Sequence, residues 1–153
     1  MDSWYPALSA NITVTAMRYL IFILALGGLL VSGLALQVHY STGTQPCSIN
    51  EKWDCGIVNH SSFSEVGHVP VAAIGIVGYL ALAWLALARQ RVLTAVGSVV
   101  GLAFALYLSY IEKDVLMVWC LYCVISQAII ALTALLSVSW MVAGWVANAQ
   151  DQT

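Results

Sequence analysis

Charged residues are scarce in this sequence. Asp, Glu, Lys and Arg make up 8% of the 153 residues, whereas 61% are hydrophobic; soluble domains carry about 25% charged residues. The few basic residues form no cluster, which excludes the electrostatic footprint of a nucleic-acid-binding protein. No nucleotide, haem or flavin motif is present either. The composition therefore indicates an integral membrane protein with few side chains available for chemistry.

Long hydrophobic runs determine the expected fold. At about 1.5 Å per residue, some twenty residues span the roughly 30 Å hydrocarbon core of a bilayer. The runs are apolar on all faces and do not alternate as transmembrane strands do. We therefore expect an all-α membrane protein, a single domain over residues 1–153 in which four transmembrane helices form a bundle. The expected helices cover about residues 19–38, 69–88, 92–111 and 116–140, and a long outer loop covers residues 39–68.

Two local signals refine the helix boundaries. In the outer loop, Ser62 and Glu65 have the spacing of a capping box and Gly67 follows as a helix stop. This pattern predicts a short interfacial helix within the loop. Asp114 is expected to cap the N-terminus of the last transmembrane helix.

The distribution of Lys and Arg gives an orientation. Arg18, Arg89 and Arg91 flank one side of the expected bundle, and Lys52 and Lys113 lie on the other. Because basic residues favour the cytoplasmic side, we expect both termini in the cytoplasm and the long loop outside, as in the inner (cytoplasmic) membrane of a bacterium. A cleaved signal peptide is the alternative for the first run, but this run exceeds the about 7–15 residues of such a peptide.

The four cysteines form two pairs on the expected outer side. Cys120 and Cys123 stand three residues apart near the start of the last helix, so they share a face and can form a reducible disulfide. A helix N-terminus favours the thiolate, and burial opposes it. Cys47 and Cys55 lie in the polar loop.

Two dithiols on one side predict a relay, since disulfide exchange passes electrons through mixed disulfides. A reduced partner would attack the loop pair, a loop thiol would attack Cys120, and Cys123 would react onward. Because Cys123 lies one turn deeper, its acceptor must be lipid-soluble, and a quinone fits. Candidate walls of the quinone pocket are the aromatic residues Phe63, Tyr110, Trp119 and Tyr122, each of which also suits an interfacial belt.

Other readings of these residues stay open. Either cysteine pair could be a structural disulfide. A metal site built from the loop cysteines with His60 and His68 lacks zinc-finger spacing, so no metal is expected. His39, His60 and His68 are expected to be solvated loop residues.

Several motifs combine into a family resemblance. Cys47 is followed by the run Asp54-Cys55-Gly56-Ile57-Val58-Asn59, then by Ser61 and Gly67, and Trp119-Cys-x-x-Cys123 comes last. With these features, nearly the whole chain resembles the vitamin K epoxide reductase family, as a bacterial homologue. The resemblance implies a four-helix bundle around a quinone, in which Cys123 reduces the quinone and Cys120 is its partner. It also implies that Cys55 exchanges with Cys120 and that Cys47 faces the redox partner.

The resemblance further implies partners and substrates. Bacterial members reoxidise a thioredoxin-like, DsbA-type protein and pass electrons to ubiquinone or menaquinone, whereas vertebrate members reduce vitamin K epoxide and quinone. Many bacterial members carry a fused thioredoxin-like domain; these residues leave no stretch for one, so a separate partner is implied. Gln127 stands where vertebrate members have Tyr, and Asn59 is a candidate polar contact to the quinone.

The expected function is that of a membrane thiol:quinone oxidoreductase that supports disulfide formation in exported proteins. Vitamin K quinone or epoxide reduction is one alternative. A DsbB-type oxidase has the two cysteine pairs in the reverse order. A non-enzymatic membrane protein with structural disulfides is the alternative from another class.

Overall fold

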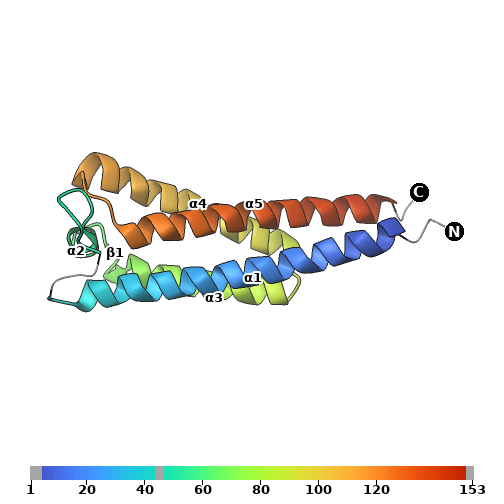
Figure 1. The fold of residues 1–153 in the computed structure, drawn as a ribbon, viewed down its shortest axis with the longest axis horizontal. Coiled ribbons are helices and arrows are strands. Elements are labelled where there is room, and N and C mark those ends of the chain that lie inside the picture. Colours follow the sequence, from blue (N-terminus) through green and yellow to red (C-terminus); the bar gives the residue numbers. More distant parts are fainter. Residues whose placement is uncertain (1–4, 44–46, 151–153) are drawn as a thin grey trace.

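Long helices dominate the computed structural model, which describes residues 5–43 and 47–150. The start of α1 and the end of α5 lie at one end of the molecule, and α2 and β1 lie at the other (Figure 1). We call the end with α2 and β1 the loop end, and the end with the start of α1 and the end of α5 the terminal end. In chain order the elements are α1 (Tyr5–Tyr40), α2 (Cys55–Asn59), β1 (Glu65–Val66), β2 (Val69–Pro70), α3 (Val71–Leu87), α4 (Arg91–Tyr110), the π-helical segment η1 (Ile111–Leu116) and α5 (Leu121–Gln150).

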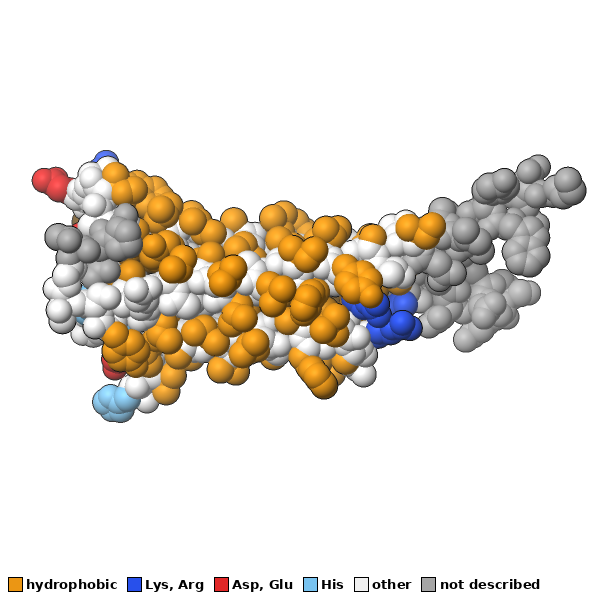
Figure 2. Space-filling view, turned by 60° about the horizontal axis from the view of Figure 1, so that its bottom comes forward, with side chains coloured by type: hydrophobic (Ala, Val, Ile, Leu, Met, Phe, Trp, Pro, Cys, Tyr) orange, Lys and Arg blue, Asp and Glu red, His pale blue; other side chains and the backbone are white. Residues whose placement is uncertain are grey.

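Within the described residues, three helical segments are long and apolar enough to cross a membrane: Ile12–Tyr40, Arg91–Leu116 and Leu121–Val146. The helix α3 is apolar but shorter, with 17 residues. Hydrophobic side chains cover the length of the bundle, while basic side chains gather toward the terminal end and acidic and histidine side chains at the loop end (Figure 2). This distribution identifies a membrane protein, as the composition predicted.

Small and polar residues let the helices pack closely. The helix α1 packs against both α3 and α5, and α5 also packs against α4. A side chain at Gly28 of α1 would collide with the ring of Tyr79 on α3, so glycine is required at this crossing. The Tyr79 hydroxyl in turn donates to the Ser126 carbonyl of α5 at 2.9 Å. Helices α3 and α4 share few contacts, which leaves room for a cavity between them.

Helix α3 lies within the expected run of residues 69–88, but the other helices differ from the expected ranges: α1 begins at Tyr5 rather than near residue 19, and α5 ends at Gln150 rather than near residue 140. Helix α4 begins one residue before the expected run and continues through η1 to Leu116. Asp114 lies exposed within η1, so the prediction that it caps the last helix is wrong, and α5 begins at Leu121 rather than near residue 116. The chain leaves the helix at Met117, which has a φ of 55°, and the Val118 N–H donates to the Glu112 carbonyl.

The capping-box prediction in the outer loop is also wrong. The only short helix in the described part of the loop is α2, which lies ahead of Ser62, and Glu65 belongs to the antiparallel pair β1–β2. Gly67 and His68 form the two-residue connection with φ values of 59° and 66°. Two consecutive positive φ angles suit a tight hairpin turn rather than a helix stop.

Candidate redox site

The loop cysteines form a disulfide at the loop end of the bundle. Cys47 and Cys55 are joined, with their Cα atoms 5.7 Å apart. Cys47 is 2% exposed and Cys55 is fully buried. Cys55 is the first residue of α2, so the bridge holds the start of this helix against the preceding loop segment.

Asp54 caps α2 immediately before Cys55. Its Oδ1 atom accepts hydrogen bonds from the N–H groups of Gly56 at 2.8 Å and Ile57 at 3.2 Å, and from the Ser48 hydroxyl at 2.9 Å. Burial alone would raise the pKa of the Asp54 carboxyl, but the hydrogen bonds from Ser48, Ile57 and Gly56 together lower it. The short helix that carries Cys55 is therefore fixed by a charged cap.

A short backbone ladder, made of two hydrogen bonds around the β-bridge between Trp53 and Trp119, joins the loop to the segment before α5. The Trp119 N–H donates to the Lys52 carbonyl at 2.8 Å, and the Asp54 N–H donates to the Trp119 carbonyl at 3.1 Å. Each side of this ladder is followed directly by a cysteine, Cys55 on one side and Cys120 on the other. The backbone pairing thus brings one cysteine of each pair into the same place.

Asn59 connects these two cysteines. Its Nδ2 atom donates to the Cys55 carbonyl at 2.9 Å and lies 3.6 Å from the Cys120 sulfur. The buried cluster around it contains Cys47, Cys55 and Cys120, with Cys123 packed against the cluster. All four sulfur atoms therefore belong to one compact region.

Cys120 and Cys123 are free thiols at the N-terminus of α5. Cys120 precedes the helix, and its carbonyl accepts the Val124 N–H at 3.1 Å, whereas Cys123 lies in the first turn. The neighbouring Cys123 thiol, helped by the N–H groups of Cys123 and Tyr122, lowers the pKa of the Cys120 thiol, although burial and the negative charge of Glu112 oppose this. A lowered pKa favours the thiolate form, which is the reactive species in disulfide exchange.

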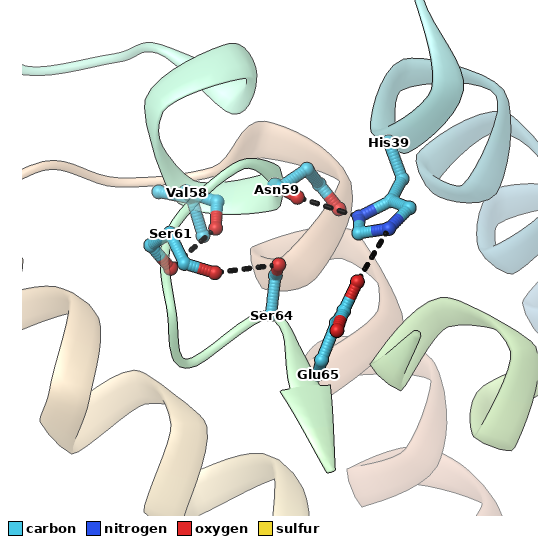
Figure 3. Close-up of polar contacts among 6 residues, drawn as sticks. All are labelled: His39, Val58, Asn59, Ser61, Ser64 and Glu65. Atoms are coloured by element: carbon cyan, nitrogen blue, oxygen red, sulfur yellow. Dashed lines mark hydrogen bonds and ion pairs between the residues drawn. The ribbon is translucent and has the colours of Figure 1, made fainter. Parts of the chain in front are cut away.

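His39, in the last turn of α1, holds the outer loop down. Its Nδ1 atom donates to the Asn59 carbonyl at 2.6 Å, and its Nε2 atom lies 3.3 Å from the Glu65 carboxylate (Figure 3). The expectation that His39 is solvated is wrong, because its side chain is 11% exposed. His60 and His68 are exposed, as expected.

Two serines fix the fold of the loop between Asn59 and β1. The Ser61 hydroxyl donates to the Val58 carbonyl, and the Ser64 hydroxyl donates to the Ser61 carbonyl, both at 2.7 Å (Figure 3). The Val71 N–H donates to the Ser64 carbonyl at 2.8 Å, so this segment is also tied to the start of α3. Together with His39, these bonds position the loop over the end of the bundle.

A cavity of about 420 Å³ lies inside the bundle below this loop. Residues from all four long helices, η1 and the loop line it, and Cys123 lies among them whereas Cys120 does not. Its walls are mainly apolar, with a few polar groups, as in small-molecule sites. The outer loop contributes Asn59, Ser61, Phe63 and Ser64 to the cavity wall, and the helices contribute polar and aromatic groups that include Tyr79, Glu112 and Tyr122.

The structure separates the expected quinone-pocket residues into two groups. Asn59, Phe63 and Tyr122 line the cavity. Tyr110 and Trp119 do not: the Tyr110 side chain is 60% exposed, and the Trp119 ring packs 6.3 Å from that of Trp53. Trp119 contributes to the site through its backbone ladder instead.

Glu112 was missed by the sequence analysis. It is buried in η1, lines the cavity, and its carboxylate accepts the Cys120 N–H at 3.1 Å. The available signal was an acidic residue directly after an apolar run and shortly before the Cys-x-x-Cys motif, since ionisable groups at such positions are seldom without a role. Gln127 does not line the cavity; its side chain accepts a hydrogen bond from Ser109.

The fold and the site together define a helical membrane protein with two redox-capable cysteine pairs beside an internal apolar cavity. Residues 19–138 match the model of the vitamin K epoxide reductase family. The chain therefore belongs to this family, which is a family of oxidoreductases. No curated protein matched the chain.

Proposed function

We propose that the protein is a membrane thiol:quinone oxidoreductase. It takes electrons from a thioredoxin-like, DsbA-type partner and passes them through Cys47 and Cys55 to Cys120 and Cys123, and from there to a quinone. The reoxidised partner then forms disulfide bonds in exported proteins.

The observation that carries this proposal is the order of the sulfur atoms in space. Cys55 and Cys120 share a buried cluster and are bridged by Asn59, and Cys123 lines the internal cavity. A disulfide that only stabilised the loop would need neither a second thiol pair next to it nor a cavity behind that pair.

The relay needs four disulfide exchanges, each of which breaks one S–S bond and forms another. A thiolate of the partner attacks Cys47 and releases Cys55, which attacks Cys120 of an oxidised Cys120–Cys123 pair and releases Cys123. The second thiol of the partner then releases Cys47, and the partner leaves oxidised. Cys47 attacks Cys55 and restores the loop bridge, so that the inner pair holds two electrons. The bonded loop pair and free inner thiols correspond to this last state.

The cavity fits a quinone ring. Its volume lies within the range of about 300–1,000 Å³ that is usual for small ligands. Phe63 and Tyr122 would hold the faces of a flat ring, and the Asn59 amide could bind a carbonyl oxygen by exchanging its long contact with the Cys120 sulfur for the quinone. A bound quinone, of the ubiquinone, menaquinone or vitamin K type, supplies a two-electron acceptor next to Cys123.

We further propose a topology with four membrane spans. The 17 residues of α3 and the turn residues around them would complete the fourth crossing. Both termini lie in the cytoplasm, because Arg89 and Arg91 flank the α3–α4 turn, while the loop end lies outside the inner membrane. There α2 lies at the interface, and the cysteines meet an oxidising compartment.

Quinol formation tests the proposal. The purified protein in lipid nanodiscs, supplied with a reduced DsbA-type protein and ubiquinone or menaquinone, should form quinol. Cys123→Ser should lose this activity while keeping its helical circular dichroism, because Cys123 is the thiol next to the cavity. If Cys123→Ser forms quinol at the wild-type rate, or if the wild-type protein forms none with either quinone, the proposal is wrong.

A further inference from the structure

A buried carboxylate stands at the meeting point of the cysteines and the cavity. Glu112 is 3% exposed although it belongs to η1, near the loop end. Its neighbours Lys113 and Asp114 in the same segment are both exposed. Burying a carboxylate is costly unless the group has partners that repay the loss of water.

The Glu112 carboxylate lies near both inner cysteines. Its Oε2 atom accepts the Cys120 N–H at 3.1 Å. Cys123 lines the same cavity as Glu112. These cysteines are the titratable groups that face Glu112 from the start of α5. One side chain is therefore hydrogen-bonded to one member of the pair and shares the cavity wall with the other.

A purely structural role does not require an acid here. The Cys120 N–H needs only an oxygen acceptor, which a glutamine side chain offers equally well. A carboxylate differs from an amide in that it can take up a proton and release it. The relevant proton is that of the Cys123 thiol, because the thiolate and not the thiol is the reactive species.

We propose that Glu112 is the proton acceptor for Cys123 during the oxidation of the inner pair. This inference rests on the proposed function and adds the path of one proton to it. The Cys123 S–H proton moves to the Glu112 carboxylate, and the Cys123 thiolate then reacts toward the cavity.

The atoms and electrons of this step balance as follows. The Cys120 and Cys123 thiols together lose two electrons and two protons, and the Cys120–Cys123 S–S bond forms. The Cys120 proton is released to water, and the quinone gains the two electrons together with two protons, one from Glu112 and one from water. Glu112 delivers the proton that came from Cys123 to a quinone oxygen and returns to the carboxylate form.

The first test compares Glu112→Gln with Asp114→Asn, a matched control in the same segment whose side chain is exposed. Glu112→Gln should lower kcat for quinol formation about a hundredfold or more, as loss of a general base does. The KM for quinone should change little, because the lost function is proton transfer rather than binding. Reduction of the Cys47–Cys55 bridge by dithiothreitol should keep its wild-type rate, and Asp114→Asn should behave as wild type in both assays.

The second test needs neither quinone nor turnover. Because no quinone is present to take the proton from Glu112, the diamide-oxidised wild-type protein should show the infrared C=O stretch of a protonated carboxyl group that the dithiothreitol-reduced protein lacks. Labelling with isotope-enriched glutamate should shift this band, and because the chain has two other glutamates, Glu51→Gln and Glu65→Gln should leave it in place, as should Asp114→Asn. This measurement decides the matter even if Glu112→Gln does not fold.

The outcomes separate this inference from the proposed function. If Cys123→Ser is inactive but Glu112→Gln keeps a wild-type kcat, Glu112 is not the proton acceptor, although the protein is still a quinone reductase. Absence of any glutamate band that responds to oxidation of the pair also overturns the inference. If the wild-type protein forms no quinol, the proposed function fails, and the infrared band alone then decides whether Glu112 exchanges a proton with the pair.

Discussion

The two ends of the bundle are held together in different ways. At the terminal end, a buried cluster of Ile21, Ala86 and Trp140 fills the space between α1, α3 and α5. At the loop end, hydrogen bonds from backbone and polar side chains hold the loop, η1 and the start of α5 around the four cysteines. The terminal end is stabilised by packing, whereas the loop end adds directional hydrogen bonds to a buried cluster of its own.

Because the two ends are held differently, we expect substitutions at one end to affect mainly stability and substitutions at the other to affect mainly electron transfer. Packing tolerates small displacements, whereas disulfide exchange requires the attacking and attacked sulfur atoms to approach in a defined geometry. Substitutions at the terminal end should therefore lower the free energy of unfolding without changing the rate of each folded molecule. Substitutions among the polar contacts at the loop end should change electron transfer more than their effect on stability suggests.

The largest effect on stability is expected at the terminal end. Trp140→Ala removes a side chain that is 1% exposed and packs against Ile21 and Ala86. It should lower the free energy of unfolding by about 3–5 kcal/mol, the usual cost of truncating a large buried aromatic residue. Unfolding in sodium dodecyl sulfate measures this change. Quinol formation per folded molecule should stay at the wild-type value; a large loss there would show that the two ends are coupled.

An intermediate effect is expected at the loop end. Asn59→Leu removes the amide that reaches both the Cys55 carbonyl and the Cys120 sulfur. Because buried polar atoms then lack this partner, the free energy of unfolding should fall by about 1–3 kcal/mol. Electron transfer from the partner protein to the inner pair should slow about tenfold or more, because about 1.4 kcal/mol in a barrier is a factor of ten.

Ile57→Ala is the control for Asn59→Leu. Ile57 lies on the same short helix, and its side chain is exposed, so both stability and transfer rate should stay near wild type. Stopped-flow measurement of inner-pair reduction gives both rates. Equal rates in Asn59→Leu and wild type would remove Asn59 from the path between the pairs.

The smallest effect is expected at the cap of α2. Asp54→Ala should lower the free energy of unfolding by about 1 kcal/mol, as loss of an N-cap does. Because the pKa of Asp54 is lowered in the folded protein, its contribution is present above the unfolded pKa of about 3.9 and is lost as pH falls through the folded value. The difference between wild type and Asp54→Ala should therefore be constant near neutral pH and shrink in acid. A difference that grows in acid would contradict the assigned cap.

The helical body of the protein was predictable because its information is local. Apolar runs gave the positions of the helices, and α4 begins within one residue of the expected start at residue 92. The predicted helix boundaries were wrong where contacts between distant segments determine the conformation. The segment before α5 pairs with Lys52 and Asp54, which lie more than sixty residues away, and this pairing holds Cys120 outside the helix.

The site was predictable only in part for the same reason. Cysteine spacing identified the two pairs, and Asn59, Phe63 and Tyr122 were named from the loop and the motif. Which aromatic residues line the cavity depends on side-chain direction, which spacing alone does not fix, as Tyr110 illustrates. The contact between Glu112 and Cys120 arises from the π-helical extension of α4, for which the sequence gives no simple signal.

The exchange between Cys55 and Cys120 is the central claim, and trapping the bond between them tests it most directly. In Cys123→Ser, Cys120 lacks its partner, so its attack on the loop bridge at Cys55 should leave a stable mixed disulfide and a free Cys47 thiol. Mass mapping of peptides from non-reduced protein, after alkylation of free thiols, should therefore find Cys55 bonded to Cys120. A bond between Cys47 and Cys120 instead, or a loop bridge that stays intact while Cys120 is alkylated, would contradict the account.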